Sequence, residues 1–206
     1  MNIALVNELA MVAADLDIDV WEAIDAAATK PFGFMRFTPG PGVGGHCLPI
    51  DPSYLSWTVR QRLGRSFRFV ELANDINDHM PDYVVSRLVR ALNKQGRAMS
   101  RARILVLGLA YKRNSSDARE SPAVALVEQL ARSGAEVVVV DPHVVEDVPG
   151  HPAVRRTTLC AAEVERADAV VLVTDHDAFD FDLITRHARY ILDTRHRLEG
   201  PHVEHL

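Results

Sequence analysis

The chain has 206 residues, of which 48% are hydrophobic and 25% charged, so it can build a proper core as one full domain with a smaller helical part. Its formal net charge of -5 argues against nucleic acid as a partner, because that interaction needs a basic surplus or a basic stripe. No apolar run approaches membrane-spanning length, the first residues carry no signal-peptide pattern, and the two cysteines lie far apart in the sequence. We therefore expect a cytoplasmic protein with reduced thiols and no membrane contact.

The first two predicted elements are helices. Residues 1–14 carry apolar side chains at helical spacing, but no N-cap residue precedes them, which suggests further helical turns before the start of this sequence. Asp19, with a glutamate three residues later, resembles a capping box and predicts a second helix that runs to Ala28. Trp21 and Ile24 are spaced to form the buried stripe of this helix together with Ala28.

Residues 30–37 form an aromatic-rich connector with three phenylalanines in six residues. Such a cluster is typical of local packing, but it also suits a flat ligand such as a nucleobase or a sugar ring. The connector leads into residues 38–52, the glycine-proline loop, which holds four glycines, four prolines and Cys47. Glycines allow close approach of the backbone, while prolines stiffen the chain between them. We therefore expect this loop to hold Cys47 at a fixed point beside a bound molecule.

Cys47 has three interpretations from the residues alone. A structural thiol would need apolar neighbours, and the glycines, His46 and Asp51 supply few. A metal ligand would need a second cysteine or a histidine cluster, so no metal site is predicted. A nucleophile is favoured by the stiff loop, the adjacent His46, and the Asp51 carboxylate, which can orient or activate water. Cys160, in contrast, is expected to be a small core residue.

Two further helical segments follow the glycine-proline loop. Pro52 suits the first turn of a helix that Gly64 ends. Residues 67–95 then form one long amphipathic segment, which Pro81 should kink or divide. The apolar stripe of this segment needs a partner, so we expect it to bridge two domains, to form a homodimer contact, or to do both.

From Ala102 onward, strands alternate with helices. This pattern is typical of a doubly wound parallel sheet, so the predicted fold class is α/β, with an all-helical region followed by a Rossmann-like domain. The carboxyl ends of parallel strands meet at one edge, which places residues 108–119, Asp141, Asp175 and residues 193–195 around one crevice. Short apolar runs predict the strands at residues 103–110, 135–140, 169–173 and 190–192, and a helix is predicted over residues 121–134.

The turn after the first of these strands, residues 108–114, lacks the Gly-x-Gly-x-x-Gly fingerprint of a dinucleotide site. This sheet is therefore not an obvious nicotinamide-cofactor domain. Lys112, Arg113 and Arg119 lie close to a strand end and to the next helix N-terminus, where they suit a phosphate or a diphosphate. The alternative, that Lys112 and Arg119 are ordinary surface charges, stays open.

Several motifs, in the right order along the whole chain, resemble the UDP-glucose/GDP-mannose dehydrogenase family. Pro-Gly-Pro-Gly-Val-Gly-Gly-His-Cys, ending at Cys47, resembles its active-site segment. Lys-Pro-Phe-Gly-Phe-Met-Arg-Phe at residues 30–37 is most similar to the bacterial UDP-N-acetylglucosamine 6-dehydrogenase branch. Asn-Ile-Ala-Leu-Val-Asn-Glu-Leu, which begins at Asn2, resembles the helix that links the family's domains. Three motifs resemble the family's C-terminal domain: Gly-Leu-Ala-Tyr-Lys from Gly108, Asp-Ala-Arg-Glu-Ser-Pro from Asp117 and Asp-Thr-Arg from Asp193.

The resemblance implies an activity, namely oxidation of the C6 alcohol of a UDP-sugar to a uronic acid in two hydride transfers to NAD, serving surface polysaccharide synthesis. UDP-N-acetylglucosamine or UDP-glucose is the implied substrate. The Cys47 thiolate would add to the intermediate aldehyde and form a thioester, and Asp51 would help to activate the water that releases the acid. The other implied contacts are Phe34, Arg36 and Phe37 around the sugar with Gly44 and Gly45 beside it, Lys112 and Arg195 on UDP, and Arg119 at the cofactor or diphosphate edge.

The family's N-terminal NAD-binding domain has no counterpart in this sequence. We therefore expect the C-terminal portion of such an enzyme, inactive by itself, with a helical central and dimerisation domain at residues 1–96 and a Rossmann-like UDP-sugar-binding domain at residues 97–206. A homodimer through residues 67–95 is expected as well. Two alternatives remain: a catalytically idle fragment that binds UDP-sugar or dimerises, and a cysteine hydrolase, for which no paired histidine and carboxylate stand at recognisable spacing.

Overall fold

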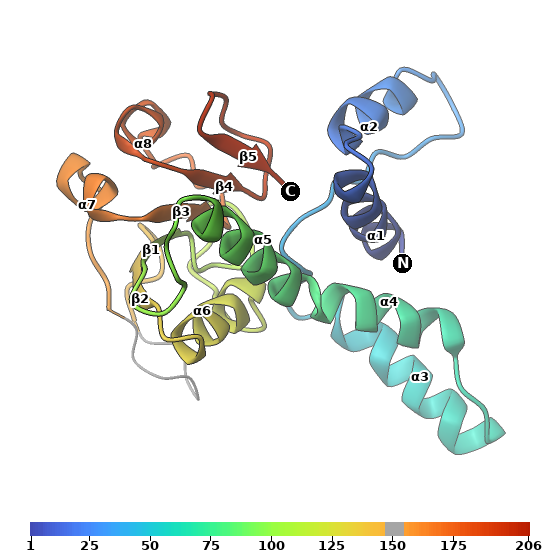
Figure 1. The fold of residues 1–206 in the computed structure, drawn as a ribbon. Helices are drawn as coiled ribbons and strands as arrows, with labels where there is room; N and C mark the ends of the chain where they lie inside the picture. Colours follow the sequence, from blue (N-terminus) through green and yellow to red (C-terminus); the bar gives the residue numbers. More distant parts are fainter. Residues whose placement is uncertain (147–154) are drawn as a thin grey trace.

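The computed structural model of the chain describes residues 1–146 and 155–206. A helical half precedes a five-stranded sheet that carries helices on both faces (Figure 1), so the predicted α/β class is confirmed. The helices are α1 (Asn2–Asp15), α2 (Val20–Ala28), α3 (Ile50–Leu63), α4 (Arg68–Asp78), α5 (Met80–Lys94), α6 (Pro122–Arg132), α7 (Ala161–Arg166) and α8 (Phe181–His187), and the strands are β1 (Arg103–Leu107), β2 (Glu136–Val140), β3 (Ala169–Leu172), β4 (Ile191–Asp193) and β5 (Val203–His205).

Helices α1 and α2 form where the sequence places the first two helices. The Asp19 carboxylate accepts hydrogen bonds from the main-chain N–H groups of Trp21 at 2.9 Å and Glu22 at 3.1 Å, which confirms the predicted cap. Trp21 and Ile24 are buried in a cluster with alanines of α1, whereas Ala28 is only partly covered. The cap and the apolar stripe together fix how α2 lies on α1.

Helices α3 and α4 form a hairpin that projects from the rest of the chain (Figure 1). Pro52 lies in the first turn of α3, and Gly64 ends that helix with φ of 63°, as the sequence predicts. Arg60 on α3 pairs with Glu71 on α4, with 2.6 Å between the guanidinium nitrogen and the carboxylate oxygen. Large apolar side chains stay exposed on this hairpin, among them Trp57, Phe69 and Leu72.

The long amphipathic segment is divided into α4 and α5, with His79 between them and Pro81 in the first turn of α5. Because proline lacks an N–H group and fixes its own φ, it starts a helix more readily than it continues one, and the predicted division is confirmed. The apolar stripe of α5 is fully buried against α6 and the sheet; its members are Met80, Val84, Leu88 and Leu92. This half of the segment therefore packs its apolar stripe within the chain.

The sheet has the strand order β2-β1-β3-β4-β5, and every neighbouring pair is parallel. Residues of alternating parity along β1 belong to two separate cores, as expected when helices cover both faces. Ile104 and Val106 pack in the core that contains α5 and α6, while Leu105 and Leu107 pack in the core that contains α7 and α8. The connections place the carboxyl ends of all strands at one edge of the sheet.

Three features differ from the sequence prediction. The short strand β5 and helix α8 were not expected; β5 carries Glu204 and His205, which give no strand-like hydrophobic pattern. Cys160, expected in the core, is exposed at the N-cap position of α7, so that expectation was wrong. Within the described residues, none of the helices has both the length and the apolar character that a membrane crossing requires.

Candidate active site

The glycine-proline loop is anchored to the helical half through a buried asparagine. The Asn7 side chain on α1 accepts a hydrogen bond from the main-chain N–H of Gly40 at 2.9 Å and donates one to the Asn77 side chain on α4 at 3.0 Å. Asn7 is fully buried, so these bonds satisfy polar atoms that water cannot reach. The start of the loop is thereby fixed between two helices.

The middle of the loop presses against the turn between β1 and α6. A Cβ atom added at Gly44 would lie 2.5 Å from the main-chain oxygen of Glu120, and one added at Gly45 would lie 2.9 Å from the ring of Tyr111. Only glycine permits so close an approach, and Gly45 also has φ of 93°. The two glycines thus bring the loop onto the carboxyl edge of the sheet, while their predicted position beside a sugar stays a prediction.

Cys47 and Asp51 lie one turn apart where the loop enters α3. The main-chain N–H of Asp51 donates to the main-chain oxygen of Cys47 at 3.0 Å, and both residues are exposed. The first turn of a helix carries unpaired N–H groups and favours negative charge nearby, which suits a thiolate and a carboxylate. The thiol is therefore accessible to a ligand from outside, as a nucleophile requires.

His46 connects the loop to the second domain through a carboxylate that the sequence reasoning did not single out. Nε2 of His46 lies 3.0 Å from the Asp117 carboxylate, which also accepts hydrogen bonds from Arg119 Nε at 3.0 Å and Nη2 at 2.9 Å. These bonds from Arg119, followed by the one from His46, hold the pKa of Asp117 well below its usual range. Arg119, the predicted cofactor contact, thus lies beside His46, which directly precedes Cys47 in the sequence.

Arg195 lies at the carboxyl end of β4, directly beneath the start of the loop. Its Nε donates to the main-chain oxygen of Val173 at 2.7 Å, and a Cβ added at Gly40 would lie 2.9 Å from its Nη1. Burial of the guanidinium lowers the pKa of Arg195 to about 10. A partly buried cation at a strand end is a candidate anion contact.

Lys112 stands on the turn after β1, the turn whose Tyr111 ring touches Gly45. Its ammonium nitrogen lies 5.4 Å from the centre of that ring, and the side chain is exposed. The carboxyl edge therefore brings three of the four predicted cationic contacts, Lys112, Arg119 and Arg195, next to the glycine-proline loop. The fourth, Arg113, forms an ion pair with Asp175.

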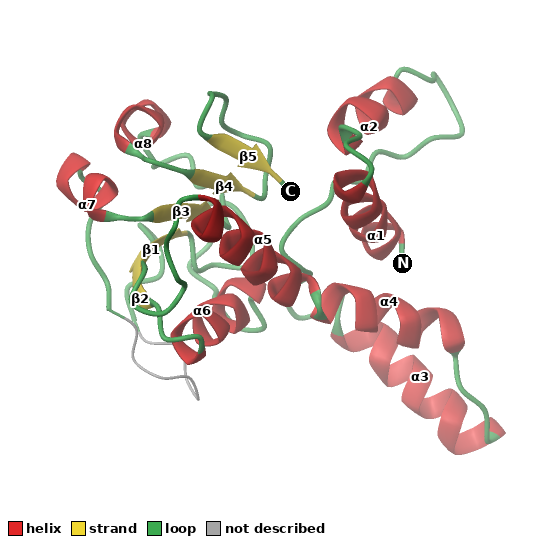
Figure 2. Cartoon of the chain, viewed as in Figure 1, coloured by secondary structure: helices red, strands yellow, loops and turns green. Residues whose placement is uncertain are grey.

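The predicted sugar contacts lie on the connector that swings out beyond α2 (Figure 2). The guanidinium of Arg36 pairs with Asp25 on α2 at 2.6 Å, and Phe34 is exposed. Phe37 is partly buried at the end of the connector. The structure thus ties Arg36 to α2, and the sugar-binding role of Phe34, Arg36 and Phe37 stays a prediction.

Asp141 was expected at the crevice, and the structure shows that it organises the chain there. Its carboxylate lies 3.1 Å from the ring of His176, and the side chains of both residues are fully buried. Burial by itself raises the pKa of Asp141, but the bonds from His176 and from the main chain outweigh it and hold the pKa well below its usual range. The four main-chain donors are the N–H groups of Leu109, Ala110, His143 and Val144.

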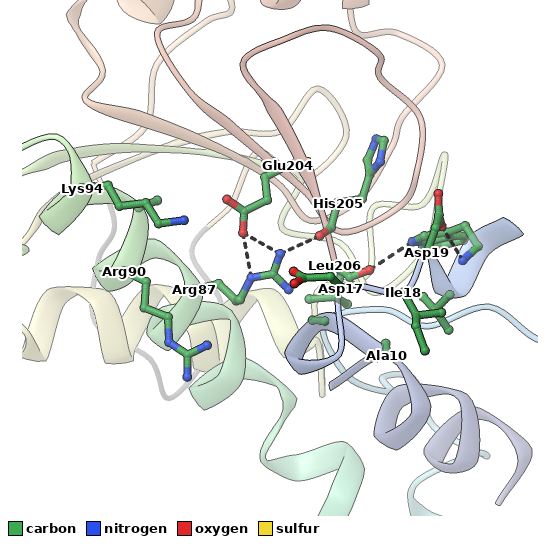
Figure 3. A pocket seen from close by; sticks show the side chains of 14 residues that line it. Ala10, Asp17, Ile18, Asp19, Arg87, Arg90, Lys94, Glu204, His205 and Leu206 are labelled. Carbon is green, nitrogen blue, oxygen red and sulfur yellow. Dashed lines mark hydrogen bonds and ion pairs between the residues drawn. The ribbon is translucent and has the colours of Figure 1, made fainter. Parts of the chain in front are cut away.

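A cavity of about 380 Å³ lies between the two halves of the chain, beside the last strand (Figure 3). Arg87 on α5 donates to Glu204 at 2.5 Å and to the main-chain oxygen of His205 at 2.9 Å. The Trp21 indole N–H donates to the main-chain oxygen of Leu206 at 3.1 Å. These bonds tie α2 and α5 to β5 and so fix the helical half against the sheet.

No group of three or more histidine, cysteine, aspartate or glutamate side chains in the described part of the chain is placed to hold a metal ion.

Two sequence profiles of one family cover most of the chain. The central domain of the UDP-glucose/GDP-mannose dehydrogenase family matches residues 1–79, and the UDP binding domain of the same family matches residues 105–200. The chain belongs to this family. The glycine-proline loop lies in the part of the chain that matches the central domain, and Lys112, Arg119 and Arg195 lie in the part that matches the UDP binding domain. The candidate site is therefore built where these two family domains meet.

Relatives within the family agree in fold and differ in sugar. The chain is 38% identical over 208 residues to UDP-N-acetyl-D-mannosamine dehydrogenase of Pyrococcus horikoshii, covering 98% of this chain and 46% of that relative. A solved structure of NDP-N-acetyl-D-galactosaminuronic acid dehydrogenase from Methanosarcina mazei Go1 matches with a TM-score of 0.83 at 29% identity, covering 99% of this chain and 46% of that one. A UDP-glucose dehydrogenase structure from Pyrobaculum islandicum matches with a TM-score of 0.81 at 26% identity, with 98% and 46% covered.

The chain spans about half the length of the curated relatives it matches, 46% in the case of the Pyrococcus protein. The matched half comprises the central and UDP binding domains of the family.

Proposed function

We propose that this chain supplies the thiol nucleophile and the UDP-binding edge of an NAD-dependent nucleotide-sugar 6-dehydrogenase. The observation that carries the proposal is the docking of the Cys47 loop onto the carboxyl edge of the sheet. Gly44 and Gly45 touch the Lys112-bearing turn, and Gly40 lies over Arg195. A UDP-sugar held by the cations of this edge would have its sugar end near the loop that carries the thiol.

The chain's own residues have defined parts in the proposed reaction, in which NAD, when bound, is the hydride acceptor of both oxidations. After the first oxidation, the Cys47 thiolate adds to the aldehyde carbon while the carbonyl oxygen takes a proton. This adduct can lose a second hydride together with the proton of its hydroxyl group, which passes to water, and a thioester is left on Cys47. Asp51, one turn further along, accepts a proton from the water that cleaves the thioester, and the acid and the free thiolate result.

The described residues fit only the edge of an NAD molecule. The turn after β1 has no dinucleotide fingerprint, and Gly108 is packed so closely that an added Cβ would lie 2.5 Å from the main-chain oxygen of Thr174. Gly108 thus packs directly against Thr174 in the turn after β3. We propose Arg119 as the contact with the cofactor or diphosphate edge.

Binding of UDP to this chain tests the nucleotide half of the proposal. We expect isothermal titration calorimetry to detect UDP, and Lys112→Ala to weaken it about 10- to 100-fold, because a hydrogen bond to a charged group contributes about 1.5–3 kcal/mol. Lys94→Ala, which removes an exposed lysine from α5, is the matched control and should leave the affinity unchanged. Absence of UDP binding to the unaltered chain would disprove the assignment of Lys112 and Arg195.

The thiol is tested in the complete enzyme, because the family's cofactor domain is needed for turnover. Cys47→Ser should abolish formation of the acid while UDP-sugar binding persists, since a serine hydroxyl is a far weaker nucleophile than a thiolate at neutral pH. Cys160→Ser, at the exposed N-cap of α7, is the control and should retain activity. Turnover that survives Cys47→Ser would rule out the covalent role.

The sugar is proposed from the connector sequence, which favours UDP-N-acetylglucosamine, with UDP-glucose as the second choice. The family relatives named above act on other sugars as well, so a substrate panel that includes UDP-N-acetyl-D-mannosamine is the appropriate test. Comparison of kcat/KM across the panel in the complete enzyme identifies the substrate. A preference for a sugar outside the first two would overturn the connector-based proposal.

A second candidate function is a catalytically idle fragment that binds a UDP-sugar. It is favoured by the fit of this chain to the central and UDP binding domains alone. The purified chain, mixed with a UDP-sugar and NAD, should then bind the sugar nucleotide without producing NADH absorbance at 340 nm. Activity of the chain alone would refute this second candidate.

We propose that the chain forms a homodimer through the α3–α4 hairpin. The α5 half of residues 67–95 is buried within the chain, which leaves the α4 half to supply the contact. A groove of about 1010 Å³ runs along the hairpin, lined by Leu63, Phe67, Phe69 and Leu72 among others. Light scattering should give a dimer mass, and the double variant Phe69→Glu, Leu72→Glu should give a monomer. A monomeric unaltered chain would refute the proposal.

A further inference from the structure

His176 is a fully buried histidine in the turn after β3, and it has no part in the reaction proposed above. Its Nδ1 accepts a hydrogen bond from the main-chain N–H of Asn114 at 3.0 Å, and its Nε2 lies 3.1 Å from the Asp141 carboxylate. Because Nδ1 accepts, the proton of the neutral ring is on Nε2, which donates to Asp141. The ring therefore joins two segments that lie far apart in the sequence.

His176 and its partner Asp141 together hold the two ends of the turn that carries Lys112. Asp141 accepts hydrogen bonds from the N–H groups of Leu109 at 2.6 Å and Ala110 at 3.0 Å, which fixes the beginning of the turn. His176 holds Asn114, which fixes its end. Residues 111–113 form the arch between these two fixed points.

The orientation of the His176 ring is itself fixed by its neighbours. The ring of His143 meets it edge-on with 4.8 Å between the ring centres, and the ring of Phe179 does the same at 5.4 Å. The Thr174 hydroxyl, two residues earlier, donates to the main-chain oxygen of Ala110 at 2.6 Å. A ring held on two sides presents its nitrogen atoms at one position, so it can set the position of what it binds.

Asn114 needs an external partner because its backbone is strained. Its φ of 55° lies in the left-handed region, which asparagine adopts more readily than most residues but still at a cost. Besides the bond to His176, its side chain donates to the Asp177 carboxylate at 2.6 Å and accepts from the Asp177 N–H at 3.1 Å. The end of the arch thus keeps a costly conformation through contacts with the turn after β3.

We infer that His176 is a positioning residue for the nucleotide: it holds the Lys112 arch in the shape that binds the UDP diphosphate. The inference rests on the proposed binding of UDP by Lys112. The exposed ammonium group of Lys112 makes no contact with His176, so the effect passes through the Asn114 main chain. Ordering the arch before the ligand arrives removes that ordering cost from the binding free energy.

Two substitutions separate the two bonds of the ring. In His176→Asn, the short side chain can place its oxygen where Nδ1 was and keep the bond to Asn114. In His176→Gln, the longer side chain can place its amide where Nε2 was and keep the bond to Asp141. Each variant loses one buried hydrogen bond. If His176 had only a structural role, two variants with the same fall in melting temperature would also lose the same UDP affinity.

The positioning role predicts unequal losses. UDP titrated by calorimetry should bind His176→Gln about tenfold more weakly than the unaltered chain, and His176→Asn within about threefold. His202→Gln alters a partly buried histidine that bonds to Thr185 in another part of the domain, and it should bind UDP normally. In the Lys112→Ala background, His176→Gln should cause no further loss, because the two residues act on one contact.

The outcomes distinguish the inference from the function on which it rests. Failure of the unaltered chain to bind UDP removes both. Normal UDP binding by a folded His176→Gln, or a tenfold loss that persists without Lys112, overturns the inference alone. If His176→Gln does not fold, hydrogen exchange of the Asn114 amide in the unaltered chain decides: protection that increases with UDP supports the inference, and exchange at the rate of a free loop amide refutes it.

Discussion

Asp141→Asn is expected to be one of the most destabilising single-atom changes available in this chain. The substitution keeps the size and shape of the side chain and replaces one carboxylate oxygen with an amide nitrogen. The carboxylate is fully buried and accepts bonds on both oxygens. Oδ1 receives the N–H groups of His143 and Val144, and Oδ2 receives Leu109, Ala110 and His176.

The size of the effect follows from this arrangement. Whichever way the asparagine amide is turned, its NH2 group faces at least two donors that then lack an acceptor. A buried donor left without a partner costs about 1–3 kcal/mol, so the better of the two orientations costs about 4 kcal/mol in total. That is a large part of the roughly 5–15 kcal/mol by which a domain is stable, and it corresponds to a fall in melting temperature of about 10 °C for a chain of this length.

The assay is denaturant unfolding followed by circular dichroism, at pH 7 and at pH 4. The pKa of Asp141 is held below its ordinary value in the folded state, so its contribution to the free energy of unfolding is complete above the ordinary carboxyl pKa of about 4 and is lost as the pH falls further. The asparagine variant has no such dependence. The difference between the two proteins should therefore be largest at pH 7 and begin to shrink at pH 4.

The matched control is Asp182→Asn, which makes the same chemical change at an exposed position in the first turn of α8. We expect it to change the free energy of unfolding by less than about 1 kcal/mol, because a surface charge near a helix N-terminus contributes little. A loss below 1 kcal/mol for Asp141→Asn, or equal losses for the two variants, would show that Asp141 does not organise the turn after β1.

Three further predictions concern the contacts that assemble the site. Gly44→Ala should destabilise the chain by about 1–3 kcal/mol in thermal unfolding, because the new Cβ would meet the rigid main-chain oxygen of Glu120 at 2.5 Å; an unchanged melting temperature would contradict this contact. Arg195→Met should abolish UDP binding in calorimetry yet leave the melting temperature equal or higher. The reason is that burial lowers the pKa of Arg195 to about 10, so the charge is held at a cost in free energy. A large drop in melting temperature would mean that the guanidinium stabilises the fold. Leu88→Ala should lower the free energy of unfolding by about 2–5 kcal/mol, since Leu88 is fully buried between α5 and the sheet domain, while Leu5→Ala at an exposed position on α1 should change it by less than about 1 kcal/mol.

Local sequence signals predicted the elements well where one residue decides the structure. Asp19 caps α2, Gly64 ends α3 and Pro81 begins α5, and in each case the reason is the chemistry of that residue and its immediate neighbours. The strands β1 to β4 were recognisable for the same reason, because each is a short apolar run. The strand β5 was not, since it is stabilised by its pairing with β4 and not by its own composition.

The proposed members of the candidate site could be named from the sequence, whereas the bonds that connect them could not. Cys47 and the cations Lys112, Arg119 and Arg195 were named from motifs and from their places at strand ends. The bond from His46 to Asp117 spans 71 positions of the sequence, and the bond from Asn114 to His176 spans 62. Contacts of this range arise only once the chain has folded, so a pattern of neighbouring residues carries no trace of them.

The contact between Gly40 and Arg195 has a consequence for how the two domains communicate. One guanidinium lies under the thiol-bearing loop and also belongs to the proposed nucleotide edge. Any ligand that draws the Arg195 guanidinium toward itself alters the contact between this group and Gly40. Any movement of the loop alters the position of the guanidinium in return. Thermodynamic reciprocity then requires that alkylation of Cys47 and occupancy of the nucleotide edge change each other's free energy by the same amount.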